Sequence, residues 1–244
     1  MGRGGTAPKD DQRLMDYVSV HAEPRGISVA GARFSPFKEL SFRWKAPLNS
    51  VSFYASDYMA DAPDEPLRQF VQGAWGYMYG RRGRFGEAYV NYIRSDEFVL
   101  KKRPLYINRS RNITYNTAGA ERDICDAVQR LLDHGLLHDS DIDNTFFSWT
   151  AKPNYTRLGY CSQVMRLVAI SRVMDSGRVP ERAFDYVVYH ECLHLRQGYR
   201  PFDSRPHDAE FRAGLRLFPG WREAEGDLAR IPGMRRRDAA EALR

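Results

Sequence analysis

The sequence predicts an α+β protein in which one helix, carrying an H-E-x-x-H motif, packs against a small and mainly antiparallel sheet. Three observations lead to this fold class. Apolar residues recur at helical spacing from Asp61 to Gly80, β-like runs occupy residues 155–171, and a helix-competent segment contains His190-Glu191-Cys192-Leu193-His194. We therefore expect the strands that precede the motif to support its helix.

The front of the chain is expected to be a flexible tail over residues 1–10, followed by an N-terminal α/β extension over residues 11–144. A short amphipathic helix is expected around residues 14–18. Phe42-Arg43-Trp44 and Val51-Ser52-Phe53-Tyr54 read as two strands, joined through turn-forming residues. We interpret the extension as a support or accessory region, either separate from the rest of the chain or continuous with its core.

The clearest amphipathic helix follows these strands. Acidic residues and prolines at 61–66 suit a first helical turn, apolar residues then recur at i, i+3, i+4 and i+7, and Gly80 ends the run. Further helices are expected over residues 88–93 and from a cap at Thr117 to His134-Gly135.

Two β-like runs, residues 155–161 and 164–171, are expected to pair as a hairpin before the motif-bearing helix. That helix is expected to begin near Pro180, which a first turn tolerates, and to end at about Gln197. Cys192 lies inside it, and we expect its small side chain to belong to the core.

The H-E-x-x-H spacing favours a metal site. His190 and His194 share one face of a helix, because positions i and i+4 lie above one another. A catalytic zinc ion takes three protein ligands and leaves one position for water. Glu191 lies beside the pair and is a candidate general base. A linker rich in turn residues brings His207 into range as third ligand, and Glu210 is the alternative third ligand.

Composition describes an ordinary globular chain of 244 residues with a formal net charge of +6. Such an excess is compatible with a polyanionic partner, but a generally arginine-rich surface explains it as well. Candidates for a DNA- or RNA-binding face are the cations of the arginine-rich segments, namely Arg81, Arg82, Arg84, Lys101, Lys102, Arg103, Arg109 and Arg111. Solvated loops are the competing interpretation of the same residues, and the favoured one.

The chain contains three cysteines, which are too few and too scattered for a disulfide framework and are typical of a reducing compartment. Residues 1–6 lead into charged residues without an apolar leader segment, and no apolar run has the length needed to span a bilayer. We therefore expect a cytoplasmic protein without a membrane partner.

The second half of the chain resembles the SprT-like zincin domain, the group of Spartan-type and Wss1-type proteases. The resemblance rests on Gly159-Tyr160, on a strand ending at Ser171, on 185–194 with its H-E-x-x-H, and on Pro206-His207-Asp208-Ala209-Glu210-Phe211. It covers about residues 145–230, and the zinc ribbon of bacterial members is missing. It implies a zincin-like metalloprotease fold for 145–232, followed by a basic tail over 233–244.

The same resemblance implies one zinc ion held by His190, His194 and His207, with Glu191 as general base in peptide-bond hydrolysis. An extended substrate, including segments of nucleic-acid-associated proteins, would pair with the edge of the strand at residues 164–171. Candidates for stabilising the oxyanion of the transition state are Tyr189, Tyr199 and Arg205.

Two other functions remain open. The segment from Leu193 to Tyr199 also resembles the H-G-x-L-H-L-x-G-Y-D-H pattern of bacterial rRNA-maturation metalloproteins, which would make the protein a metal-dependent RNA hydrolase. Glu191 stands at the position of that pattern's glycine, and no histidine directly follows Tyr199. The second alternative is a non-catalytic, zinc-containing adaptor for nucleic acid, although structural zinc sites usually have four protein ligands.

Overall fold

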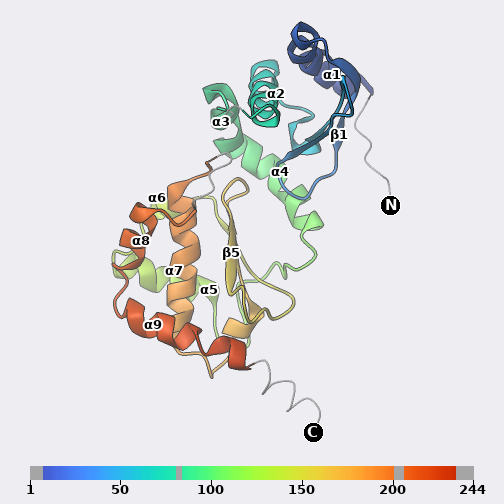
Figure 1. Cartoon of the computed structure of the whole chain (residues 1–244). Helices are drawn as coiled ribbons and strands as arrows, with labels where there is room; N and C mark the ends of the chain where they lie inside the picture. The colour runs from blue at the N-terminus through green and yellow to red at the C-terminus, as the bar shows by residue number, and fades with distance from the viewer. Residues whose placement is uncertain (1–7, 81–83, 201–205, 235–244) are drawn as a thin grey trace. The chain divides into compact units, whose positions relative to one another are not determined.

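The computed structural model describes residues 8–80, 84–200 and 206–234 of a chain that divides into two compact units, Met1–Arg109 and Ser110–Arg244 (Figure 1). The division falls after Arg109, earlier than the boundary expected between residues 144 and 145. The reason is that helix α5 (Ile124–Asp133) packs against helix α7 (Glu181–Gln197), which carries the H-E-x-x-H motif. Each unit is a mixed α/β structure with its own three-stranded sheet.

The first unit consists of α1 (Pro8–Ala22), β1 (Ser28–Ser35), β2 (Phe42–Lys45), β3 (Ser50–Ser56), α2 (Asp64–Met78), α3 (Glu87–Arg94) and α4 (Asp96–Arg109). The predicted helices over 61–80 and 88–93 are confirmed, and so are the two predicted strands. Helix α1 already begins at Pro8, so residues 8–10 are helical rather than part of a tail. Residues 1–7 lie outside the described residues.

The sheet of the first unit has the strand order β1-β3-β2, with β1 parallel and β2 antiparallel to β3. Alternate residues of β3 are buried, which places Val51, Phe53 and Ala55 on the covered face. Helix α2 packs on this face, where the rings of Phe42 and Phe70 lie 6.0 Å apart. The sequence did not predict β1 as a separate strand or its parallel pairing.

Four of the candidate nucleic-acid cations lie on helix α4 and not in a loop, namely Lys101, Lys102, Arg103 and Arg109. Asp61 accepts hydrogen bonds from Lys102 and, at 2.7 Å, from Lys101. Arg109 pairs with Asp57 and donates to the carbonyl of Phe37 at 2.7 Å. These partners hold Lys102 and Arg109 largely out of solvent, so the expectation of solvated loops is wrong for this segment.

Two of the other candidate cations, Arg84 and Arg111, are exposed. Arg81 and Arg82 lie outside the described residues.

The second unit consists of α5, α6 (Asp139–Ile142), β4 (Phe146–Trp149), β5 (Gly159–Ser162), β6 (Leu167–Ile170), α7, α8 (Ala209–Leu215) and α9 (Trp221–Leu228). The hairpin of β5 and β6 is confirmed, and α7 has the predicted extent. Asp123 caps α5, accepting from the Cys125 amide at 2.8 Å, so the prediction of a cap at Thr117 is wrong. An aspartate directly before the first helical residue is the better acceptor for its free amides.

The second sheet has the order β4-β6-β5, with β4 parallel and β5 antiparallel to β6. It is therefore mixed, and the expectation of a mainly antiparallel sheet is wrong. Because β6 is the central strand, both its edges already pair with neighbours. The expected pairing of an extended substrate with the edge of residues 164–171 is therefore wrong. The free edges of this sheet belong to β4 and β5.

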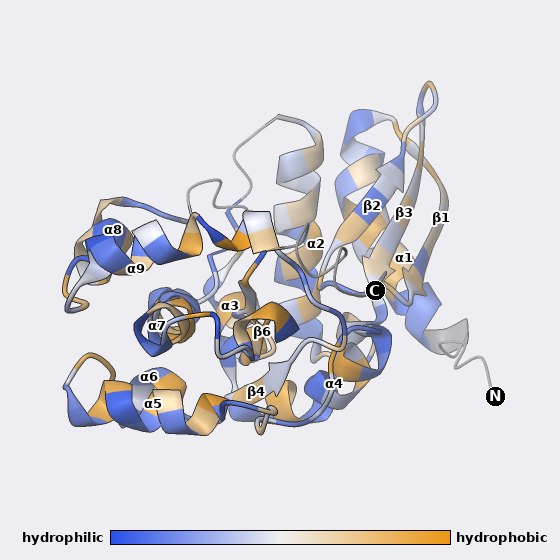
Figure 2. Cartoon of the chain, turned by 90° about the horizontal axis from the view of Figure 1, so that it is seen from below, coloured by the Kyte–Doolittle hydropathy of each residue, from blue (hydrophilic) through white to orange (hydrophobic). Residues whose placement is uncertain are grey.

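Helix α7, seen nearly end-on in Figure 2, contributes apolar side chains to the core of the second unit. Among them, Ala183, Phe184, Val188 and Cys192 are fully buried. The rings of Trp149 on β4 and Phe184 on α7 are stacked at 5.5 Å. Cys192 thus belongs to the core, as predicted. No helix among the described residues is both long enough and apolar enough to cross a membrane.

Candidate metal centre

Helix α7 presents two histidines side by side. The buried apolar residues of α7 fix its rotation, and His190 and His194 then share the adjacent, half-buried face with ring centroids 5.1 Å apart. The side chain of Gln163, between β5 and β6, donates to the carbonyl of His194 at 2.7 Å. The end of the helix that carries the two histidines is in this way attached to the sheet.

His207 reaches the pair from the start of α8. Its Nε2 atom lies 3.1 Å from Nε2 of His194, and one nitrogen of each of the three imidazoles lies within 4.8 Å of the others. Asp208 caps α8 by accepting from the Phe211 amide at 2.8 Å. The structure therefore brings the three expected ligands together.

Phe211 lies against all three rings. The centroid of its ring is 5.0 Å from His190, 4.4 Å from His194 and 4.7 Å from His207, and its side chain is almost completely buried. A rigid aromatic ring at this position limits the rotamers that each imidazole can adopt. In the sequence, Phe211 stands out only as part of the family pattern, with no role expected for it.

A short polar chain connects the segments that carry His194 and His207. Oε1 of Gln197 lies 3.4 Å from Nδ1 of His194, while Nε2 of Gln197 donates to Asp208 at 3.3 Å. Asp208 also accepts from Arg200 at 2.8 Å. A partner on the far ring nitrogen orients an imidazole ligand and selects its tautomer. Sequence reasoning missed Gln197, although its position one turn after His194 was a usable signal.

Glu191 lies on the other side of the histidine pair and faces β5. Its side chain is buried, and this burial raises the pKa of the carboxyl to about 8, with the positive charge of Arg157 opposing the rise. Gly159 of β5 leaves the necessary space. A Cβ atom there would lie 2.8 Å from both Cγ and Oε1 of Glu191, closer than packed atoms allow. Gly159 was noted in the sequence only as part of the resemblance.

The environment keeps two of the histidines neutral. Burial, with the neighbouring imidazoles as a further cause, lowers the pKa of His190 to about 3 and that of His194 to about 4. Neutral imidazole is the form that donates a nitrogen lone pair to a metal ion.

The remaining predicted site residues lie apart from this cluster or point away from it. Tyr189 is buried and its hydroxyl donates to the carbonyl of Gly214 at 2.9 Å, so the structure gives no support to its prediction as an oxyanion stabiliser. Tyr199 is half-buried in the segment after α7, and Arg205 lies outside the described residues. Glu210 is not in the group of converging ligand atoms, which among the described residues contains only the three histidines.

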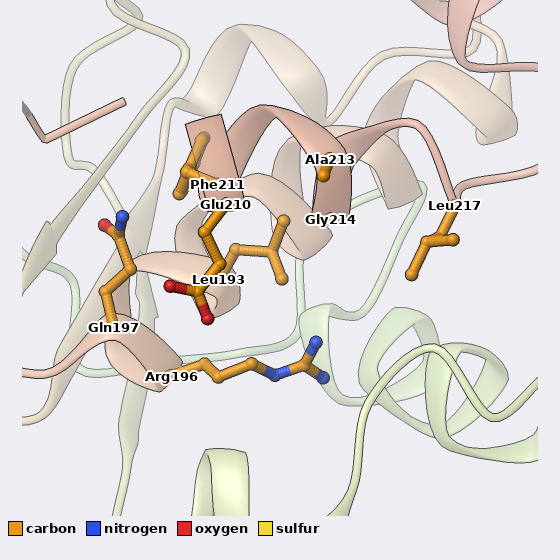
Figure 3. Close-up of a pocket in the computed structure, with 8 residues that line it drawn as sticks. All are labelled: Leu193, Arg196, Gln197, Glu210, Phe211, Ala213, Gly214 and Leu217. Atoms are coloured by element: carbon orange, nitrogen blue, oxygen red, sulfur yellow. The ribbon is translucent and has the colours of Figure 1, made fainter. Parts of the chain in front are cut away.

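Glu210 instead lines a cavity of about 330 Å³ between α7 and α8 (Figure 3). Its side chain extends from α8 toward α7 beside Leu193, and Leu217 lies at the far end. Gln197 and Phe211 form the wall nearest the histidines. The alternative ligand set with Glu210 thus has no geometric support.

Comparison of the chain with protein-family models gives no match, and comparisons with curated proteins and with solved structures give none either. The SprT-like resemblance therefore stays a prediction that rests on the motif residues.

Proposed function

We propose that the protein is a zinc-dependent metallopeptidase of the H-E-x-x-H class. The observation that carries this proposal is the convergence of three imidazoles from α7 and the start of α8, beside a glutamate buried against β5. A carboxylate next to an open metal position is what activation of water requires.

The donor set fits a catalytic zinc ion better than a structural one. His190, His194 and His207 supply three nitrogen ligands, and no fourth cysteine, histidine or carboxylate joins this group among the described residues. Structural zinc sites usually have four protein ligands, whereas catalytic sites leave a position for water or substrate. The donor count therefore favours an enzyme over a non-catalytic adaptor.

Zinc, when held by these histidines, would make water nucleophilic at neutral pH and polarise the carbonyl of the scissile peptide bond. With its pKa lowered by the charge of the bound ion, Glu191 would take the proton of the attacking water and pass it to the departing amine. Its burial keeps bulk water away and strengthens its interactions with the reacting groups. An extended peptide would pair with the outer edge of β5. Gly159 of this strand lies directly against Glu191.

The decisive experiment replaces Glu191 with Gln, which keeps the shape of the side chain but removes the base. We expect zinc content near one ion per chain and a loss of about 10²- to 10⁴-fold in the hydrolysis of unfolded casein. Glu210→Gln, on α8 and outside the histidine group, is the matched control and should retain both properties. Full activity of the Glu191→Gln protein would refute the assigned mechanism.

The ligand set has its own test. His207→Ala should lose zinc, whereas Glu210→Ala should keep it, because only His207 converges with the other imidazoles. Zinc retained by the first variant and lost by the second would show that Glu210 is the third ligand.

A further inference from the structure

On one face of the sheet of the first unit, the strand residues are exposed or only partly buried. Residues on the face opposite Phe53 lie in two rows across the strands. In one row Tyr54 of β3 stands between Arg33 of β1 and Arg43 of β2, and in the next row Ser52 stands between Gly31 and Lys45. Figure 2 shows the three strands next to one another. We call these six residues the open face.

The open face is positively charged without local compensation. Arg33, Arg43 and Lys45 are exposed, and among the described residues none of the three pairs with a carboxylate. None of the six residues is acidic. This differs from α4, where Asp61 pairs with Lys101 and Lys102 and Asp57 pairs with Arg109. A ligand with regularly spaced negative charges would complement the face.

Aromatic rings lie among these cations. The guanidinium carbon of Arg33 lies 5.1 Å from the centre of the partly buried Tyr54 ring, and that of Arg43 lies 4.8 Å from the Phe37 ring just beyond β1. A Cβ atom added at Gly31 would meet nothing within 4 Å, so the surface beside Tyr54 is open. Rows on one face of a strand repeat at about 7 Å.

We propose that the open face binds a short segment of single-stranded nucleic acid. An unpaired base would stack on Tyr54, while Arg33, Arg43 and Lys45 contact the phosphates on either side. Bases must leave a duplex before they can stack on a ring, which favours a single strand. An acidic protein segment would satisfy the cations but would make no use of the ring. The inference is independent of the metal centre and of peptidase activity.

The test measures binding of fluorescently labelled oligothymidine and oligouridine of equal length by anisotropy. The full chain carries Glu191→Gln in every sample, so that no proteolysis can interfere. We expect single strands of either kind to bind better than the corresponding duplex. Each phosphate contact should add about 0.7 to the salt dependence of log K, so the pair Arg33→Gln and Arg43→Gln should lower the slope by about 1.4.

Base stacking is tested at Tyr54. Tyr54→Phe keeps the ring and should keep the affinity, whereas Tyr54→Thr, which suits a strand, should weaken binding about 5- to 100-fold. Arg84→Gln with Arg111→Gln removes the same charge from the exposed segments and is the matched control, with little expected effect. Circular dichroism checks the folding of each variant, and the arginine pair decides the test if Tyr54→Thr is unfolded.

Three results would overturn the proposal. The first is that the Tyr54→Thr chain binds the single strands as tightly as the chain with an unsubstituted open face. The second is an equal loss in the Arg84/Arg111 control and in the Arg33/Arg43 pair. The third is competition by polyglutamate as strong as by oligothymidine, which would identify an acidic protein segment as the ligand class.

Discussion

The two units contain sheets of the same topology. In the first sheet β1 and β3 are parallel neighbours and β2 pairs antiparallel with β3, and in the second sheet β4, β6 and β5 repeat this arrangement. In both, the third strand of the unit lies in the centre. A shared strand order therefore does not explain why, among the described residues, the candidate metal centre lies in the second unit.

The difference lies in how the central strand is covered. All four residues of β6 are buried, whereas β3 alternates between buried residues and residues with partial exposure. The second sheet supports α7 and holds Glu191 against Gly159. The first sheet keeps Tyr54 at the surface among cations. Covering a sheet thus provides rigid positions for chemistry, and leaving one face open provides a surface for binding.

The largest expected effect is on the covered sheet. Trp149→Ala should lower the free energy of unfolding of the second unit by about 3–5 kcal/mol, because it removes a fully buried ring stacked on Phe184. Hydrogen exchange measured by mass spectrometry should show faster exchange in α5 and α7, with α2 unchanged. Equal loss of protection in α2 would contradict the separation of the two cores.

A similar loss is expected on the covered face of the first sheet. Phe53→Ala should destabilise the first unit by about 3–5 kcal/mol, since Phe53 is 1% exposed and packs against Phe42. The measurement is the same exchange experiment, now with faster exchange expected in α2. If α5 and α7 lose protection instead, the assignment of Phe53 to a separate core is wrong.

A smaller effect on stability, with a clear effect on activity, is expected at β5. Gly159→Ala should displace Glu191 and lower kcat/KM by about 100-fold while zinc stays bound, because the new methyl group overlaps the base and not the ligands. Gly226→Ala on α9 is the control, since a Cβ there meets nothing within 4 Å. Unchanged kcat/KM in Gly159→Ala would show that the base does not depend on this contact.

The smallest effect on stability is expected on the open face. Tyr54→Thr should change the free energy of unfolding by less than about 1 kcal/mol, because the lost ring contacts are at the surface and threonine suits a strand. Urea unfolding of Tyr54→Thr and of Phe53→Ala, measured separately, compares the loss in free energy of unfolding for two neighbouring residues on opposite faces of the sheet. A loss as large as that of Phe53→Ala would mean that the open face is in fact covered.

Local patterns predicted α2, α3, α7 and the pairing of neighbouring strands, whereas α4, whose cations were expected in loops, and pairing over long distances were missed. The periodicity of α2 and the motif of α7 lie within single segments, and so does the pairing of β5 with β6. The parallel pairs of β1 with β3 and β4 with β6 join strands separated by another strand, and no local signal encodes them. The mixed character of both sheets follows from these pairs.

The candidate site shows the same limit. Spacing alone selected His190, His194 and Glu191, and His207 was chosen from a short list of histidines. Side-chain direction could not be derived for Tyr189 or Glu210, because each depends on the packing of α8 on α7. The role of Gly159 was also hidden, since a glycine has no side chain to suggest that it makes room for another residue.

The contact of Phe211 with all three imidazoles has a consequence for how the protein would acquire its metal. Packing around this ring would hold the three imidazoles in place before an ion arrives, so little conformational entropy would be left to lose on binding. Uptake and release of zinc would then be reversible steps of an already folded chain, unlike the folding of a zinc finger. Activity would follow the concentration of free zinc without a refolding delay.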